Sequence, residues 1–149
     1  MTKTPTVFDV SKYILEKNGA MTHMKLQKLV YYSQAWSLVW DEQQLFEEKI
    51  EAWINGPVVP VLFQSLKGSF LVSSDSVPGN STNLNQVQKE TVDSVLDFYG
   101  GFSSQYLSDL THLEAPWKQA RSGISEHLRG NGEITASMMA NYYGGLDVS

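Results

Sequence analysis

The stretch from Leu26 to Trp40 constrains the fold more than any other part of the chain. Its apolar residues recur at helical spacing in two stripes, which lie on different sides of one helix. A helix that is apolar on more than one side must be covered by neighbours, so we predict that it is the central, buried element. Thr22 is its expected N-cap. The side chains expected in the core are Leu26, Leu29, Val30 and Trp36.

This stretch is not expected to span a membrane, because polar side chains such as Lys28 and Gln34 interrupt it. Residues 1–5 contain no apolar run, so we predict no signal peptide and a cytoplasmic location. The length of 149 residues suits one domain. We therefore expect a single domain over residues 1–149, with an exposed polar loop at 73–83.

One segment alternates as a strand does. Ile50, Ala52 and Ile54 stand at every second position, which predicts a short strand at 50–55, followed by a turn at Gly56-Pro57. Most other segments have helical periodicity. The predicted fold class is therefore mainly α (α+β): a single-domain helical bundle with a small β-element around residues 50–55.

Capping and breaking residues set the limits of the helices before residue 101. The first helix is predicted from about residue 7 to 17, with its end at Asn18-Gly19. A short helix begins at Pro60, where proline is tolerated. A long helix follows an N-cap at Asn83 and ends at Gly100-Gly101. Its predicted apolar face comprises Val87, Thr91, Val95 and Phe98, with Val92 and Leu96.

Three further helices are predicted beyond residue 101. The first has its N-cap at Ser103 or Ser104. A turn at 115–116 leads to a short helix at 117–121. The last helix opens at 133–135 and closes at the glycines 144–145.

The residue types give little sign of catalytic chemistry. The chain has no cysteine, which excludes disulfides, thiol nucleophiles and thiolate metal sites. Its histidines, His23, His112 and His127, do not stand at metal-ligand spacing. Phosphate-binding glycine loops and nucleophile motifs are also missing. We therefore expect no metal, no cofactor and no catalytic residues, and predict that the protein is not an enzyme.

The net charge of −5 argues against nucleic-acid binding by the chain itself. Basic residues are scattered, and Lys25 with Lys28 is the tightest group. A cluster of acidic residues is typical of a solvated face, and the alternative is a docking surface for a basic partner. The cluster comprises Asp41, Glu42, Glu47, Glu48 and Glu51.

Two segments, 51–60 and 110–118, combine Trp, Pro and polar residues at predicted element boundaries. Polar groups among apolar neighbours need hydrogen-bond partners, and Trp-rich patches dominate many interfaces. We predict that the two segments lie close together, either as a structural clasp or as a partner-binding site. The residues assigned to this site are Trp53, Asn55, Gly56, Pro57, Thr111, His112, Glu114, Pro116 and Trp117.

Three runs, in this order and spacing, resemble one protein family. Residues 25–36 have the pattern K-L-Q-K-L-x-Y-Y-x-Q-x-W, and residues 45–60 have L-F-x-x-x-I-E-A-W-x-x-G-P-V-x-P. Residues 110–117 have L-T-H-x-E-x-P-W. Together the runs resemble the phage-associated GepA-like and SocA-like family, whose shared unit is called the Panacea antitoxin domain.

The resemblance implies a prophage-associated antitoxin of a toxin–antitoxin system. Such a protein neutralises its cognate toxin by direct contact, and one kind of member is a proteolytic adaptor that delivers the toxin to the ClpXP protease. The implied partners are therefore a toxin protein and, for an adaptor, ClpXP. The alternatives are a small hydrolase or nuclease that uses His112 and Glu114, an orphan phage protein that acts on host factors, and a nucleic-acid regulator that uses Lys25 and Lys28.

Overall fold

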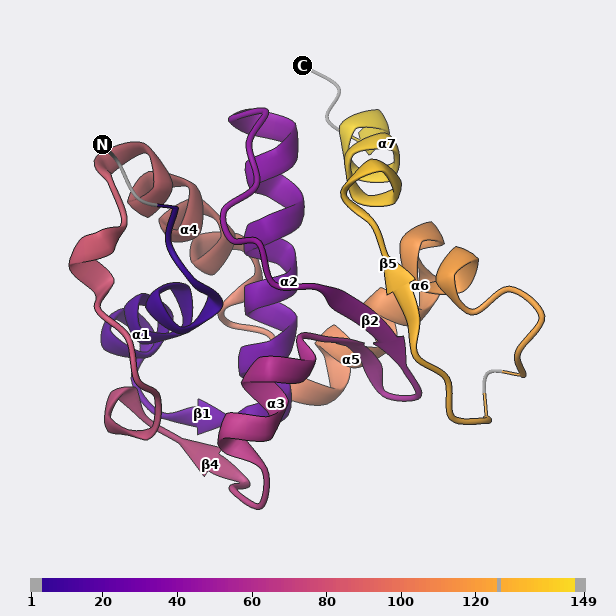
Figure 1. Cartoon of the computed structure of the whole chain (residues 1–149), viewed down its shortest axis with the longest axis horizontal. Helices are drawn as coiled ribbons and strands as arrows, with labels where there is room; N and C mark the ends of the chain where they lie inside the picture. Colours follow the sequence, from indigo (N-terminus) through magenta and orange to yellow (C-terminus); the bar gives the residue numbers. More distant parts are fainter. Residues whose placement is uncertain (1–3, 126, 147–149) are drawn as a thin grey trace.

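The computed structural model describes residues 4–125 and 127–146. In these ranges helices surround one central helix, and two small antiparallel sheets complete the fold (Figure 1). The predicted fold class, mainly α with a small β-element, is confirmed. The elements are α1 (Val7–Asn18), β1 (Met21–Thr22), α2 (His23–Trp40), β2 (Ile50–Trp53), β3 (Gly56–Val58), α3 (Pro60–Leu66), β4 (Leu71–Val72), the 3-10 turns η1 (Ser74–Ser76) and η2 (Ser81–Asn83), α4 (Gln86–Tyr99), α5 (Ser104–Leu113), α6 (Ala115–Ala120), β5 (Gly132–Ile134) and α7 (Ala136–Leu146).

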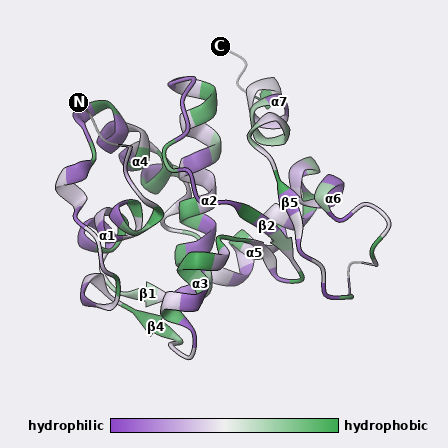
Figure 2. Cartoon of the chain, viewed as in Figure 1, coloured by the Kyte–Doolittle hydropathy of each residue, from purple (hydrophilic) through white to green (hydrophobic). Residues whose placement is uncertain are grey.

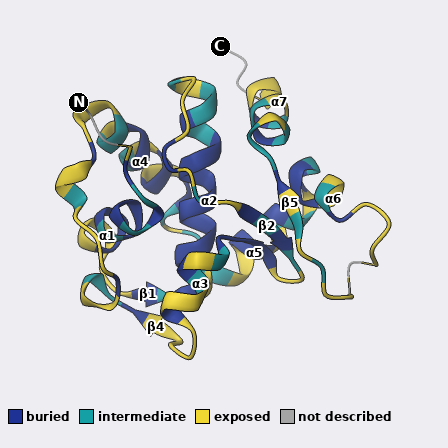
Figure 3. Ribbon diagram, viewed as in Figure 1, coloured by how far each residue is buried: buried dark blue, intermediate teal, exposed yellow. Residues whose placement is uncertain are grey.

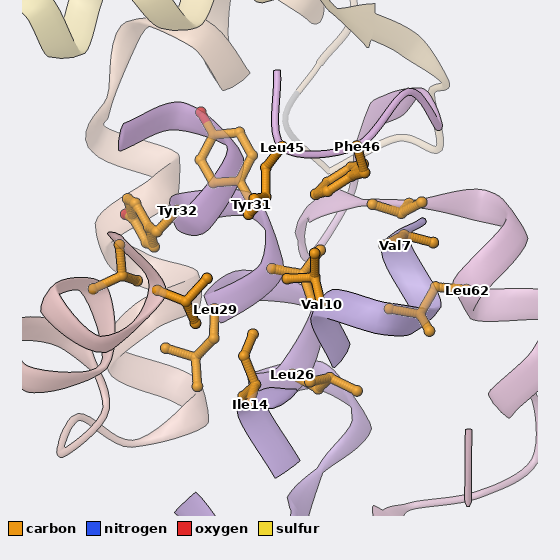
Figure 4. Close-up of a cluster of buried hydrophobic side chains, with 14 of the residues drawn as sticks. Val7, Val10, Ile14, Leu26, Leu29, Tyr31, Tyr32, Leu45, Phe46 and Leu62 are labelled. Atoms are coloured by element: carbon orange, nitrogen blue, oxygen red, sulfur yellow. The ribbon is translucent and has the colours of Figure 1, made fainter. Parts of the chain in front are cut away.

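The central helix is α2, which is buried along most of its length (Figure 3). α1, α4, α5 and α7 all pack against it, as its two apolar stripes predict. The Thr22 hydroxyl accepts a hydrogen bond from Lys25 N, which confirms the predicted N-cap. Leu26 and Leu29 are fully buried and lie beside Val10 and Ile14 of α1 (Figure 4). No helix of the described ranges is long and apolar enough to cross a membrane.

The prediction that Trp36 belongs to the core is wrong, because this side chain is only half-buried. Its indole Nε1 donates a hydrogen bond to the Tyr99 hydroxyl at 3.0 Å. Its ring stacks on that of Trp40, with centroids 4.9 Å apart. Trp36 therefore forms part of the wall of a surface groove near the end of α2. Val30, the remaining residue assigned to the core, is fully buried.

The polar segment 73–83 is mostly exposed and contacts α1 through η1 and η2. Val77 is its buried apolar anchor. The Asp9 carboxylate accepts hydrogen bonds from Asn80 N at 2.8 Å and from Asn83 Nδ2 at 3.2 Å. The segment is thus fastened to α1 by polar contacts as well as by one buried side chain.

α4 begins later and buries a different stripe than predicted. Its N-cap is Asn85, in a capping box with Gln88. Asn83, the predicted N-cap, instead donates a hydrogen bond to the Asp9 carboxylate. Val87 and Phe98 are 55% and 66% exposed, so their assignment to the buried face is wrong. The stripe is rotated because Tyr99 is buried and stacks on Tyr32 of α2. The buried residues of α4 are Thr91, Val92, Val95, Leu96 and Tyr99.

Proline and serine define the ends of the shorter helices. Pro60 opens α3, as predicted. Ser103 is the N-cap of α5, one of the two serines considered. α6 starts at Ala115 rather than at Trp117, so Pro116 lies in its first turn and not in a preceding turn. A proline there removes an N–H group that has no partner within the helix.

The main sheet has the strand order β3-β2-β5. β2 covers residues 50–53 of the strand predicted at 50–55, and Gly56 and Pro57 are not the turn that follows it. They belong to β3 and pair with Trp53 and Ala52, and the turn is formed by residues 54–55. The glycine is needed in the strand, because its φ of 122° is unfavourable for other residues.

The last helix also begins later than predicted, because residues 132–134 form β5. Ile134 pairs with Ile50 of β2, which gives this short segment its conformation. α7 starts at Ala136, and it includes Gly144 and Gly145, which were expected to end it.

Candidate functional site

Four consecutive carbonyl groups of the β2–β3 hairpin accept hydrogen bonds from side chains of the α5–α6 region. Trp117 Nε1 donates to the Trp53 carbonyl at 2.7 Å, and Ser108 Oγ donates to the Asn55 carbonyl at 2.6 Å. His112 Nε2 lies 2.8 Å from the Ile54 carbonyl, and Arg121 Nη1 donates to the Ala52 carbonyl at 3.1 Å. We call this set the carbonyl clasp: the carbonyls of residues 52–55 with the side chains of Ser108, His112, Trp117 and Arg121.

Stacked side chains hold the donors of the carbonyl clasp in place. The ring centroids of His112 and Trp117 are 4.0 Å apart, and the Arg121 guanidinium lies 5.0 Å from the centroid of Trp117. Trp117 is only 3% exposed, so its indole is a structural member of the site. Arg121 also donates to the carbonyls of Ser125 and Leu128. It therefore ties the following loop to the hairpin.

The structure brings together most of the residues that the sequence assigned to the site. Gly56 and Pro57 are buried within the hairpin and Thr111 is buried in α5, whereas Trp53 and His112 are half-buried and Asn55 is exposed. A Cβ atom on Gly56 would lie 3.0 Å from Thr111 Oγ1, which shows how closely β3 approaches α5. Pro116 is buried in the first turn of α6. Ser108 and Arg121 were not predicted from the sequence, because neither belongs to a recognisable motif.

Glu114 is the assigned residue that lies apart from the carbonyl clasp. Its Oε1 accepts hydrogen bonds from the hydroxyls of Tyr32 and Tyr143, each at 2.7 Å. Tyr31 and Tyr143 share a further hydrogen bond of 2.9 Å. Burial raises the pKa of Glu114, and the two tyrosine hydroxyls partly offset that effect. This buried network joins α2 and α7 to the corner between α5 and α6.

A pocket of about 490 Å³ opens next to the hairpin. We call it the hairpin pocket and define it by Lys28, Trp53, Ile54, Phe63 and Phe70. Most of its exposed surface is apolar, although Asn55, Ser69 and Gln105 also line it. Phe70 is 78% exposed, and the adjoining β4 is hydrophobic in Figure 2 although partly exposed in Figure 3. Exposed apolar surface around a cavity is typical of a binding site.

Lys28 lines the hairpin pocket although it is only 1% exposed. Among the described residues, no hydrogen bond or ion pair engages its ammonium group. Burial lowers the pKa of Lys28 to about 7. His23 lines the same pocket. Its pKa is lowered by burial and, to a smaller extent, by the nearby Lys28. Neither Lys28 nor His23 was assigned to the site from the sequence.

A second, larger hollow of about 600 Å³ lies between the ends of α2, α4 and α5. Its aromatic side chains contact one another, with ring centroids 4.5 Å apart for Phe102 and Tyr106. Trp40, Phe98 and Tyr106 are exposed, and the Glu114 network lies at its base. We call it the aromatic groove, defined by Trp36, Trp40, Phe98, Phe102, Tyr106 and Leu110.

Comparison with protein families identifies the chain. Residues 26–118 match the model of the family described as "Antitoxin SocA-like, Panacea domain". The chain belongs to the SocA-like antitoxin family. No curated protein and no solved structure matches it.

The region shared with the SocA-like family extends from α2 into α6. It therefore contains the residues that define the two hollows and most of the carbonyl clasp, whereas His23, Arg121 and the Tyr143 partner of Glu114 lie outside it. Membership of an antitoxin family suggests a non-catalytic role. It also implies, in general, a toxin as the partner.

The geometry does not favour the alternative of a hydrolase that uses His112 and Glu114. Both ring nitrogens of His112 face carbonyl oxygens, those of Ser108 and Ile54, so neither is directed at a substrate. Glu114 has separate partners. A nucleic-acid surface built on Lys25 and Lys28 is likewise not favoured, because Lys28 is buried and Lys25 Nζ donates to the Gly100 carbonyl. Within the described residues, no group of three or more metal-ligating side chains is arranged to hold a metal ion.

Proposed function

We propose that this protein is an antitoxin that binds its cognate toxin directly through the aromatic groove. The observation that carries the proposal is an exposed group of aromatic side chains on a chain of an antitoxin family. Aromatic side chains supply much of the binding energy at protein interfaces, because they bury large areas with little loss of conformational freedom. The proposal includes a prophage origin and a cytoplasmic site of action.

Rigid packing beneath the groove supports this assignment. Tyr32 and Tyr99 stack with centroids 4.0 Å apart under its floor, and Trp36 is fixed by its hydrogen bond to Tyr99. A preformed aromatic surface loses little entropy when a partner binds. The carbonyl clasp, by contrast, directs most of its polar groups inward at the hairpin, so we assign it a structural role.

The test is co-expression with the protein encoded next to this gene. We expect the neighbouring protein to arrest growth, this chain to restore growth, and the two proteins to co-purify. Phe98→Ser, which alters the aromatic groove, should weaken binding about 30-fold, as the loss of an interface hot spot does. Phe70→Ser is the matched control, because Phe70 is similarly exposed but lies at the hairpin pocket.

Two results would contradict the proposal in different ways. If the neighbouring protein is toxic but growth is not restored, the chain is not its antitoxin. If Phe70→Ser abolishes binding and Phe98→Ser does not, the toxin binds at the hairpin pocket and the aromatic groove has another role.

A proteolytic adaptor would do more than bind. Under this extension of the proposal, the toxin level falls when the chain is present, and deletion of ClpXP restores both the toxin level and growth arrest. Neutralisation that persists without ClpXP, at an unchanged toxin level, would instead show inhibition by binding alone.

A further inference from the structure

We propose that the hairpin pocket binds a carboxylate group attached to an aromatic body, with the Lys28 ammonium as its charge partner. The inference concerns a different site from the proposed toxin contact and does not depend on it. It rests on a buried cation and a second donor, neither of which has a partner within residues 4–125 and 127–146, and on apolar walls of suitable size.

The ammonium group of Lys28 is buried beside the hairpin pocket. A buried ammonium group is costly unless an anion or several acceptors surround it. Lys28 has no such partner among the described residues, yet it lines an open hollow. A methionine of similar length would fill the same space without this cost. An anion that enters the hairpin pocket would supply the missing partner.

The backbone at Gly56 lies close to the end of the Lys28 side chain. A Cβ atom on Gly56 would lie 2.5 Å from Lys28 Cε and 3.3 Å from Nζ. β3 therefore passes directly over the end of this side chain and confines the ammonium group. Because β3 confines the ammonium group, its charge is held in a fixed position. A fixed charge is a condition for selective recognition of an anion.

A second donor, Nδ1 of His23, lies on the same helix as Lys28. Gln27 Oε1 accepts a hydrogen bond from Val59 N at 2.9 Å, which orients the amide so that its Nε2 donates to His23 Nε2 at 3.0 Å. The proton of the neutral His23 ring is therefore on Nδ1. Among the described residues, no acceptor engages that Nδ1 proton.

The nature of the walls selects the ligand. Trp53 and Phe63 contact edge to face with centroids 4.9 Å apart, and Phe63 also lies 5.4 Å from the His23 ring. Such walls favour a flat apolar body, and about 490 Å³ is in the range of small-ligand pockets. One lysine suits the single charge of a carboxylate. A phosphate carries more charge and more acceptor oxygens, and its sites usually add arginine forks or a set of backbone N–H groups to any lysine.

The experiment measures binding of 3-phenylpropionate and of its neutral amide, 3-phenylpropionamide, to the whole chain by NMR titration and calorimetry. We expect the acid to bind at least about 10-fold more tightly than the amide. Lys28→Met should reduce the affinity for the acid to that for the amide. Phe70→Ser should weaken both ligands alike, and Phe98→Ser, at the aromatic groove, should leave both unchanged.

A second arm distinguishes a free acid from the end of a protein chain. It uses a short peptide ending in phenylalanine, with either a free or an amidated C-terminus. Tighter binding of the free form assigns the hairpin pocket to a partner's C-terminus, and binding of 3-phenylpropionate alone assigns it to a small molecule. Absence of binding by both acids, equal binding of acid and amide, or a preference that survives in Lys28→Met would overturn the proposal.

Discussion

Gly56 lies directly over the aliphatic stem of Lys28, so that a Cβ atom at position 56 would approach Lys28 Cε to 2.5 Å. This contact joins the hairpin to the central helix at Lys28, the buried lysine that lines the hairpin pocket. It also explains why a glycine with a φ of 122° stands in β3. Gly56 therefore meets two requirements: a backbone conformation of positive φ, and space for the side chain of Lys28.

A substitution at Gly56 should therefore be more harmful than at a glycine of positive φ with open space around it. We expect Gly56→Ala to lower the free energy of unfolding by about 2–4 kcal/mol, through φ strain and the clash with Lys28. Gly19→Ala is the control for strain alone, because Gly19 also has a positive φ but open space around it. Equal losses for the two variants in chemical denaturation would show that Lys28 gives way easily.

Lys28→Met should stabilise the protein by about 2–4 kcal/mol near pH 7, because it removes an unpaired buried charge. The pKa of Lys28 is lowered from 10.5 to about 7 in the folded state. Between these values the unfolded chain binds more protons, so the stability of the wild type rises with pH. The wild type should gain about 2 kcal/mol relative to Lys28→Met from about pH 7 to about pH 9.

The control for that experiment is Lys67→Met, which makes the same change of charge at an exposed position. It should alter the unfolding free energy by less than about 0.5 kcal/mol. Destabilisation by Lys28→Met near pH 7 would mean that the ammonium group has a stabilising partner, contrary to its environment in the structure.

Trp117→Phe tests the structural role of the carbonyl clasp. The change keeps most of the buried ring but leaves the Trp53 carbonyl without its donor, which should cost about 1–3 kcal/mol in unfolding free energy. Trp40→Phe is the matched control, since Trp40 is 44% exposed. If Trp117→Phe abolished toxin binding at unchanged stability, the clasp would be part of the binding site instead.

Glu114→Gln should remove a pH dependence of stability. Burial raises the folded-state pKa of Glu114 above its usual value of 4.5. The folded state therefore binds the proton more readily, and the stability contribution is fully present below about pH 4.5 and is lost as the pH rises through the folded pKa. We expect the wild type, but not Glu114→Gln, to lose this contribution in urea denaturation series. Glu133→Gln, at an exposed position of β5, should behave as the wild type does.

Several elements could be predicted from the sequence because short-range interactions produce them. The limits of α1 and α2 follow from Gly19, from the Thr22 cap and from apolar residues at helical spacing. The alternation of residues 50–54 likewise predicts a strand without knowledge of its partners. In each case the residues that decide the conformation are close neighbours along the chain.

Other features depend on which surfaces meet in the folded chain. β5 is a strand because it pairs with the distant β2, and α4 is rotated because Tyr99 packs on Tyr32. Glu114 was predicted to lie in one site with His112. The turn between α5 and α6 instead directs the Glu114 side chain into the tyrosine network.

Lys28 shows most clearly what could not be predicted from the sequence. In the sequence it is one of two lysines on a helix, and lysines are normally solvated. Only the tertiary structure places β3 across it and buries it, because the contact with Gly56 joins residues far apart in the chain. The sequence by itself determined the central helix, the hairpin strand and the family. The packing of the hairpin on α2 and α5 decided the burial of Lys28, the carbonyl clasp and the two hollows, since each of these requires side chains from several elements at once.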